Sequence, residues 1–293
     1  MKYFVAVAEE RSFGRAAKRL HMSQPPLSTQ IKGLEEELGV TLLDRSTRRV
    51  ELTDSGRTFL ERAREILGAV EEAGAEARGA GLGVRGRLEI GFVSSATLSL
   101  LPPALRLFRE RFGEVELDLR ELASVEQLEA LYEGEIRVGL VRLPLRASGI
   151  RLEPVLAEPL VVALPVGHPL EARESIPLEE VAELPLIFFQ RRLEPGSHEQ
   201  IVELLGRVGA LPKVAQYSVH LQTVIGLVAS GIGIAILAES ARRMNREGVV
   251  YRPLDVPDAT SWLGLAWLER DESPLVENFV NIVREVAGDG ILG

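Results

Sequence analysis

The sequence predicts an α/β protein with three parts: an N-terminal winged helix-turn-helix, a long linker helix and a C-terminal α/β domain. Three patterns lead to this prediction. Two helical segments and a basic hairpin occupy residues 1–56, a helical apolar stripe runs through residues 57–84, and short apolar strands alternate with helices over residues 85–293. The length of 293 residues favours about two folded domains.

The N-terminal segment has the signals of two consecutive helices. The first ends near Leu20, and Ser23 then stands at an N-cap position, with Pro25 and Pro26 in the next first turn, where proline is tolerated. Gly39 marks the end of the second helix. Spacings of four, three and four residues predict one buried face on this helix, made of Leu27, Ile31, Leu34 and Leu38.

The opposite face of the second helix carries small and polar side chains near its N-terminus. Such groups can donate to phosphates or read base edges in a major groove, while the acidic run Glu35–Glu37 lies at the far end. The alternative is a solvated helical hairpin without a partner. We expect DNA contacts from Ser23, Gln24, Pro25, Ser28, Thr29 and Lys32.

The segment from Leu42 to Leu52 is typical of a two-stranded wing. Arg45, Arg48 and Arg49 cluster at its tip, from which guanidinium groups can reach a DNA backbone or a minor groove. Ordinary surface arginines are the alternative. The helical motif or the wing alone would be weak evidence, but together they favour DNA binding, with Arg48 and Arg49 as further contacts.

Residues 3–56 resemble the N-terminal domain of LysR-type transcriptional regulators without a gap, through YFVAVAEERSFGRAAKRLHMSQPPLSTQIKGLEEELGVTLLDRSTRRVELTDSG. Many relatives carry arginine at the position of Thr29, so no base contact is carried over there. The resemblance implies a regulator that binds a dyad-symmetric promoter site in double-stranded DNA. It also implies homo-oligomers, usually a tetramer formed as a dimer of dimers, with RNA polymerase as a further candidate partner.

The charge is divided unevenly along the chain. Residues 1–58 contain ten Lys or Arg and eight Asp or Glu, a net charge of +2. The whole chain carries −9, so the remainder carries −11 and would repel nucleic acid. DNA contact should therefore be confined to the N-terminal domain, and tight binding would need more than one such domain, which favours an oligomer.

Residues 57–84 predict a long linker helix followed by a glycine-rich hinge. Its apolar stripe comprises Phe59, Ala63, Ile66, Leu67, Val70, Ala73 and Ala77. One interpretation is a dimerisation helix, as the resemblance implies, and the other is an amphipathic helix packed on its own domain. We favour the dimer because the preceding domain is too small to cover the whole stripe.

The C-terminal part predicts α/β units with parallel sheets. The expected strands are Arg87–Val93, Val115–Glu121, Val138–Arg142, Leu160–Leu164, Leu186–Phe189, Ile234–Leu237, Val249–Pro253 and Leu263–Leu268. The expected helices are Leu98–Phe112, Val125–Glu133, Leu178–Ala182, His198–Val208, Leu221–Ala229 and Pro274–Ala287.

The resemblance further implies that this part is an effector-binding domain with two lobes, similar to periplasmic solute-binding proteins. Lobe I would comprise residues 87–158 and 263–293, and lobe II residues 159–262, so that the chain crosses between them twice. The alternation of strands and helices alone would also fit one large sheet.

Polar residues follow the expected strands, where ligands of α/β domains bind at helix N-termini. Hydroxyls, free backbone N–H groups and an arginine suit a small anionic effector, such as a carboxylate. The candidate residues are Ser94, Ser95, Thr97, Ser124, Arg142, Gln190, Pro195, Ser197 and His220. Singly, the hydroxyls could be plain helix caps, the arginine a salt bridge and the histidine a polar loop residue. Relatives that sense acidic aromatic intermediates use hydroxyls at the positions of Ser95 and Ser124, and some place arginine at that of Arg142.

The sequence gives little support for the interpretation that the protein is an enzyme. It contains no nucleophile elbow, Walker loop, zinc-protease motif or dinucleotide fingerprint, so we expect no catalytic residue and no cofactor. Four histidines without metal-ligand spacing and the lack of cysteine give no reason to expect a metal or a disulfide. No apolar run approaches the roughly 20 residues that span a bilayer, and no signal peptide is evident, so we expect a cytoplasmic protein.

We therefore expect a transcriptional regulator whose promoter binding is modulated by a small molecule held between two lobes. A stand-alone solute-binding protein does not explain the N-terminal motif. An architectural DNA-binding protein without an effector remains an alternative, and ligand binding to the purified protein distinguishes the two.

Overall fold

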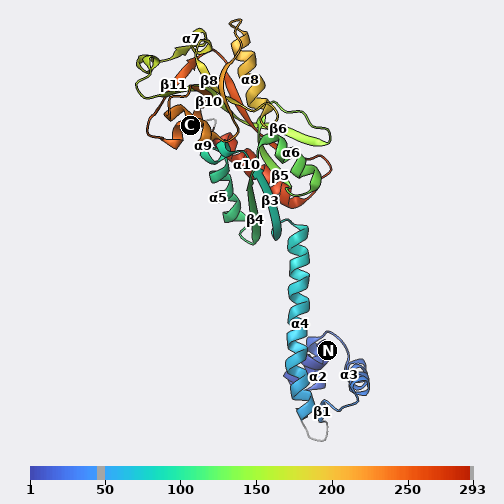
Figure 1. Ribbon diagram of the computed structural model, residues 1–293. Helices are drawn as coiled ribbons and strands as arrows, with labels where there is room; N and C mark the ends of the chain where they lie inside the picture. The colour runs from blue at the N-terminus through green and yellow to red at the C-terminus, as the bar shows by residue number, and fades with distance from the viewer. Residues whose placement is uncertain (45–49, 291–293) are drawn as a thin grey trace. The chain divides into compact units, whose positions relative to one another are not determined.

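The computed structural model describes residues 1–44 and 50–290 and divides the chain into two compact units, Met1–Arg78 and Gly79–Gly293 (Figure 1). In its described residues, the first unit consists of three short helices, a short hairpin and most of a long helix. The second is built on a mixed sheet. Each unit is described on its own below.

The first unit has the predicted helix-turn-helix and the base of the predicted wing. Its elements are α1 (Lys2–Glu10), α2 (Phe13–Arg19), α3 (Gln24–Leu38), β1 (Leu43–Asp44), β2 (Glu51–Leu52) and α4, which spans Asp54–Gly81. Ser23 is the N-cap residue of α3, and Gly39 ends that helix in the left-handed conformation at φ 70°. The predicted positions of both cap residues are therefore confirmed, although the Ser23 side chain makes no capping hydrogen bond.

Three helices and the hairpin enclose a small core. Phe4, Val7, Leu27 and Ile31 are buried there with the consecutive residues Leu42 and Leu43, and Phe59 of α4 packs edge-on against Phe4. The predicted apolar face of α3 is only half buried in the chain. Leu34 is partly buried and Leu38 is exposed, because the core ends before the last turn of α3.

The beginning of α4 lies close to the base of the hairpin. A Cβ atom on Gly56 would lie 2.0 Å from the carbonyl oxygen of Leu42, so only glycine allows this approach. The carboxylate of Glu35 accepts hydrogen bonds from the backbone N–H groups of Leu42 at 2.8 Å and Leu43 at 3.0 Å. These contacts hold the hairpin base between α3 and α4.

The second unit carries the remaining elements. Its strands are β3 (Gly86–Phe92), β4 (Val115–Glu121), β5 (Val138–Leu143), β6 (Ile150–Pro165), β7 (Ile176–Pro177), β8 (Pro185–Phe189), β9 (Lys213–Ser218), β10 (Ala235–Ala238), β11 (Val249–Asp255) and β12 (Thr260–Leu268). Its α-helices are α5 (Leu101–Arg111), α6 (Ser124–Glu133), α7 (Leu178–Ala182), α8 (Pro195–Gly206), α9 (Leu221–Ala229) and α10 (Pro274–Gly290). Short 3-10 helices are η1 (Ser94–Leu98), η2 (Pro169–Ala172) and η3 (Glu239–Met244).

The main sheet of the second unit is mixed, which corrects the prediction of parallel sheets. Its order is β4-β3-β5-β12-β6-β11-β7, with β10 also paired to β6, and a separate pair is formed by β8 and β9. The pairs β3–β4 and β3–β5 are parallel, whereas β12 and β6 run antiparallel to their neighbours. The first half of β6 was missed because prolines and charged residues interrupt its apolar pattern, and β9 was missed because most of its residues are exposed and it has few apolar side chains.

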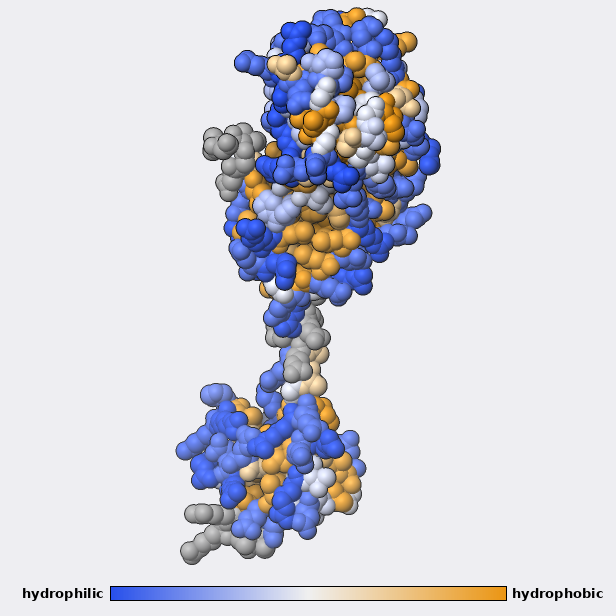
Figure 2. Space-filling view, turned by 60° about the vertical axis from the view of Figure 1, so that its left-hand side comes forward, coloured by the Kyte–Doolittle hydropathy of each residue, from blue (hydrophilic) through white to orange (hydrophobic). Residues whose placement is uncertain are grey.

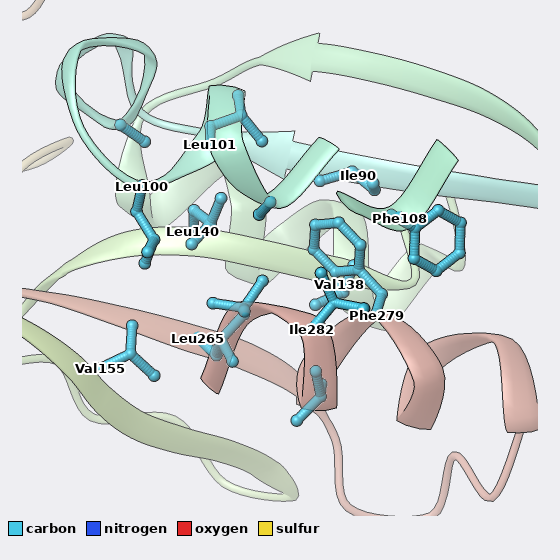
Figure 3. Close-up of a cluster of buried hydrophobic side chains, with 14 of the residues drawn as sticks. Ile90, Leu100, Leu101, Phe108, Val138, Leu140, Val155, Leu265, Phe279 and Ile282 are labelled. Carbon is cyan, nitrogen blue, oxygen red and sulfur yellow. The ribbon is translucent and has the colours of Figure 1, made fainter. Parts of the chain in front are cut away.

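Two halves of the second unit have separate cores. In one half, β3, β5 and β12 pack against α5 and α10, and Figure 3 shows Ile90, Phe108, Leu140 and Phe279 in this core. In the other half, β6, β8 and β10 pack against α7 and α8 on one side, and against α9 on the other.

Strands β6 and β12 run through both halves. Their pairing extends from Pro159 opposite Thr260 to Ile150 opposite Leu268, with a register shift at Leu263 and Gly264. The chain therefore passes between the two halves within continuous strands, and the ends of β3 and β5 come to lie beside α8 and η3. This arrangement positions the site described below. Among the described residues, no helix has the length and apolar character needed to cross a bilayer.

Candidate functional site

The N-terminal part of α3 exposes the polar face predicted for DNA contact. Ser28 is half-buried, and the other five candidates on this helix and its cap are exposed: Ser23, Gln24, Pro25, Thr29 and Lys32. The Ser23 hydroxyl makes no capping hydrogen bond, and the Lys32 ammonium forms only an exposed ion pair of 3.4 Å with Glu36. These side chains are therefore accessible to a ligand.

The wing is described only at its base, where Leu43 pairs with Leu52 and Asp44 with Glu51. Arg45, Arg48 and Arg49, which were predicted to contact DNA, lie outside the described residues.

A cavity in the second unit brings together four of the predicted effector-binding residues. Ser94 and Ser95 of η1, Arg142 of β5 and Ser197 of α8 line it. Four polar residues that the sequence analysis missed also line it: Glu194, Gln200, Ser240 and Ser261. The apolar walls include Phe189, Leu221 and Ile236.

Arg142 lies at the centre of the polar network in this cavity. Its guanidinium is 2.9 Å from the Glu158 carboxylate, so the salt bridge considered as an alternative role is present and is buried. Its Nε donates to Ser95 Oγ at 3.0 Å, and its Nη1 donates to Ser261 Oγ at 3.2 Å. Its Nη2, although buried, has no hydrogen-bond partner among the described residues.

Ser124 plays a different part from the one predicted. It is fully buried at the first turn of α6 and does not line the cavity. Its hydroxyl donates to Glu194 Oε2 at 2.7 Å and accepts from the Arg142 backbone N–H at 3.1 Å, and its own N–H donates to Glu194 Oε1 at 2.9 Å. The hydroxyl is therefore occupied within the protein, and the carboxyl of Glu194 faces the cavity in its place.

Glu194 is the most unusual group of the site. Its side chain is buried before the first turn of α8, and burial raises its pKa above the ordinary value, against the opposing effect of the Ser124 hydrogen bonds and the nearby Arg142. The start of α8 lies against the end of β5, since a Cβ atom on Gly196 would lie 2.6 Å from the Arg142 carbonyl oxygen. A glycine at this position keeps Glu194 beside Arg142.

The other predicted effector residues do not line the cavity. Thr97 is exposed and its hydroxyl donates to the Ser94 carbonyl at 2.6 Å. Gln190 is exposed and bonded through its backbone to Ser218. Pro195 begins α8, and the exposed ring of His220 lies 3.7 Å from Glu121. Their positions next to lining residues follow from the strand-end rule, but the local backbone turns these four side chains elsewhere.

Sequence reasoning could have found Glu194 but not Ser261. Glu194 directly precedes Pro195 and Gly196, the helix start that was already a candidate. Ser261 lies within β12, two residues before the predicted start of that strand, and reaches the cavity only because β12 crosses both halves of the unit. Within residues 1–44 and 50–290 no group of His, Cys, Asp and Glu is placed to hold a metal ion.

Two apolar surfaces of the described chain lack a cover. On α4, Phe59 and Ala63 face the core of the first unit, whereas Ile66 and Val70 are 46% and 63% exposed. In the second unit, a groove between α5 and the edge strand β4 is lined by Leu105, Leu117 and the exposed Leu119. Figure 2, which brings the side of α5 toward the viewer, shows a hydrophobic area on this unit.

Comparisons with known proteins cover nearly the whole chain. Residues 1–57 match the model of the bacterial regulatory helix-turn-helix protein, lysR family, and residues 82–288 match the LysR substrate binding domain. The chain is 39% identical to the HTH-type transcriptional regulator AlsR of Bacillus subtilis (strain 168), over 96% of this chain and 93% of that protein. It is 40% identical to the probable cat1 operon transcriptional activator of Acinetobacter lwoffii, over 97% and 94%.

Solved structures agree with this assignment. The crystal structure of full-length CbnR, complexed with its target DNA, superposes with a TM-score of 0.84 at 29% identity and covers 98% of both chains. Full-length BenM superposes with a TM-score of 0.62 at 31% identity, over 99% of this chain and 96% of that one.

Proposed function

Because the chain belongs to the LysR family of transcriptional regulators, we propose that the cavity around Arg142 binds its effector and that this effector is a small carboxylate. The protein is a DNA-binding transcriptional regulator rather than an enzyme, with a helix-turn-helix domain and an effector-binding domain. The proposed division assigns residues 1–56 to DNA binding, 57–84 to dimerisation and 85–293 to effector binding.

The observation that carries this proposal is the free Nη2 of Arg142. A buried N–H group without an acceptor costs free energy, on the order of 1–3 kcal/mol or more for a charged group, so an acceptor brought by a ligand would bind strongly there. A carboxylate oxygen is a suitable acceptor, because it adds charge to the hydrogen bond.

Other donors of the cavity support the same ligand class. In the first turn of α8, where Pro195 has no N–H, the backbone N–H groups of Gly196 and Ser197 have no acceptor within the helix, and the positive end of the helix dipole favours an anion. Ser95 and Ser197 supply hydroxyls on opposite sides, from η1 and from α8, and the apolar wall beside Phe189 would accept a hydrocarbon part. A small monocarboxylate or dicarboxylate satisfies these groups.

On the DNA side we propose that the exposed face of α3 enters a major groove and that the wing contacts the backbone beside it. Two copies are needed for a dyad-symmetric site. The exposed Ile66 and Val70 of α4 suit a helix pair between two copies, and the groove of α5 and β4 suits a second contact between copies. A dimer of dimers uses both surfaces.

The proposed regulation links the cavity to the assembly. The cavity lies between the two halves of the second unit, so an effector that prefers one arrangement of these halves shifts the population toward it. Through the oligomer this changes the spacing of the DNA-binding domains and the affinity for the promoter. RNA polymerase is a candidate partner at that promoter, and we infer that the protein acts in the cytoplasm, where promoter DNA is found.

The test is a thermal-shift screen of the full-length protein. Acetate, succinate and benzoate form the carboxylate set, and ethylamine, benzylamine and benzyl alcohol form the matched set without a carboxylate. We expect carboxylates alone to raise the melting temperature, since a ligand at 100 times its Kd adds about 2.7 kcal/mol of stability. A shift with the amines would overturn the ligand class. No shift with any compound would favour the architectural alternative.

A further inference from the structure

Glu194 lines the same cavity as Arg142. A site that binds an anion through an arginine does not by itself explain an acidic residue in the same cavity. Glu194 is only 5% exposed. The two oxygens of its carboxyl group accept one hydrogen bond each from Ser124, from the backbone N–H and the hydroxyl. Each oxygen therefore keeps a lone pair that no hydrogen bond among the described residues uses, and a ligand in the cavity could donate to it.

The charges around Glu194 disfavour the arrival of an anion while the carboxyl group of Glu194 is ionised. From β5 Arg142 faces Glu194, but its guanidinium is already paired with Glu158 of β6 at 2.9 Å. From α6 Glu126 adds a negative charge, and its own carboxylate accepts from the Ala123 N–H. On α8 itself, the ring of His198 lies 2.9 Å from the Phe189 carbonyl oxygen. One arginine therefore serves two buried carboxyl groups before any effector arrives.

A carboxylate effector bound at Arg142 Nη2 would be a third carboxyl group beside the same arginine. Two ionised carboxylates in one buried site repel each other, and such pairs avoid the repulsion by keeping a proton on one of them. Burial has already raised the pKa of Glu194, so this group takes the proton more readily than a free glutamate does.

We propose that binding of a carboxylate effector at Arg142 is coupled to the uptake of one proton by Glu194, so that the effector binds more tightly as the pH falls. The inference depends on the proposed function of this cavity. The proton comes from solvent and Glu194 changes from −1 to neutral as the effector adds −1, so the net charge of the cavity is unchanged. The neutral carboxyl group then donates its O–H to an oxygen of the effector, and Glu194 becomes a residue that selects effectors with an acceptor at this position.

Isothermal titration calorimetry of the full-length protein tests this coupling. Acetate and benzoate are the probes, between about pH 5.5 and about pH 8, where both are ionised. Each titration is repeated in phosphate and in Tris, whose ionisation enthalpies differ, to count the protons taken up. Glu194→Gln keeps the size of the side chain without the titration, and Glu203→Gln on the exposed face of α8 is the matched control.

We expect the affinity of the wild type and of Glu203→Gln for the carboxylate to fall by up to tenfold for each unit that the pH rises. Binding should take up at most one proton. Glu194→Gln should bind with a constant affinity and no proton uptake. A wild type that binds without proton uptake, or a Glu194→Gln variant that keeps the wild-type slope, overturns the coupling but leaves the carboxylate site intact. The proton count on the wild type alone decides the matter if Glu194→Gln does not fold. Failure of every carboxylate to bind removes both proposals.

Discussion

Arg142 Nε donates a hydrogen bond of 3.0 Å to Ser95 Oγ, although the two residues are 47 positions apart in the sequence. The contact joins the end of β5 to the 3-10 helix that follows β3, two neighbouring parallel strands. It fixes the guanidinium so that Nη2 stays free in the cavity.

Ser95→Ala should weaken the binding of the best carboxylate by about tenfold to a hundredfold. The variant removes a hydroxyl that lines the cavity and leaves Arg142 Nε without its acceptor, and a hydrogen bond to a charged group contributes about 1.5–3 kcal/mol. Calorimetry measures the loss. Ser230→Ala, at the exposed end of α9, is the control and should bind as the wild type does. Equal affinities of all three proteins would remove Ser95 from the site.

Ser124→Ala should act on stability more than on direct ligand contact. The Ser124 hydroxyl is buried between Glu194 and the Arg142 N–H, so its removal leaves two buried groups short of a partner, at a cost of about 1–3 kcal/mol. Urea unfolding with and without Glu194→Gln measures this cost. The two substitutions should be less than additive, because both act on the same hydrogen bond: one removes the donor hydroxyl and the other replaces the carboxyl acceptor with an amide. Full additivity would show that the bond contributes nothing.

The Arg137–Asp271 pair should contribute stability that disappears in acid. Burial raises the pKa of Asp271, but the hydrogen bonds from Arg137 and from the Ser273 N–H lower it by more than burial raises it. The net pKa is therefore below the ordinary 3.8. This contribution is present above 3.8 and is lost as the pH falls through the lower folded pKa. Arg137→Gln should therefore cost about 1 kcal/mol or less near neutral pH. The cost should shrink in acid.

Chemical unfolding at several pH values measures this dependence, with Arg191→Gln as the control at an exposed ion pair. A cost for Arg137→Gln that does not change between neutral pH and acid would contradict the prediction.

Lys32→Ala should weaken binding to every duplex and lower the salt slope by about one, as expected for loss of one phosphate contact. Gln24→Ala should instead cost about 1–3 kcal/mol on the specific site alone, if its amide reads a base edge. Salt-titrated binding to operator and random duplexes separates the two effects. Lys213→Ala, which removes the same charge from the exposed surface of the second unit, should change neither. Unchanged DNA binding by both Lys32→Ala and Gln24→Ala would exclude α3 as the contact helix.

Ile66→Glu with Val70→Glu should dissociate the proposed helix pair. Both side chains are exposed in the single chain, so the substitutions cost little within one copy but would place carboxylates in an apolar seam between two. Analytical ultracentrifugation should show a smaller particle, and cooperative binding to paired half-sites should be lost. Glu71→Gln on the same helix is the control. A double variant with the wild-type mass and operator affinity would show that α4 does not pair.

The sequence by itself determined the features that depend on local spacing. The capped helix α3, the apolar stripe of α4 and helices such as α7 and α9 follow from residues a few positions apart, and the structure has these helices at the predicted places. The sequence also identified Ser95, Arg142 and Ser197, because a hydroxyl or a charge near the end of an apolar strand or at the start of the helix that follows can be recognised without knowing its partner.

Only the tertiary structure decided how these groups are used. Strand β6 is interrupted by Pro154 and Pro159 in the sequence, and its pairing with β12 makes the sheet mixed and brings Ser261 and Glu158 to Arg142. Ser124 is buried under Glu194 because Gly196 lets α8 approach β5 closely. Burial, pairing and pKa depend on distances between residues far apart in the chain, and local patterns do not contain those distances.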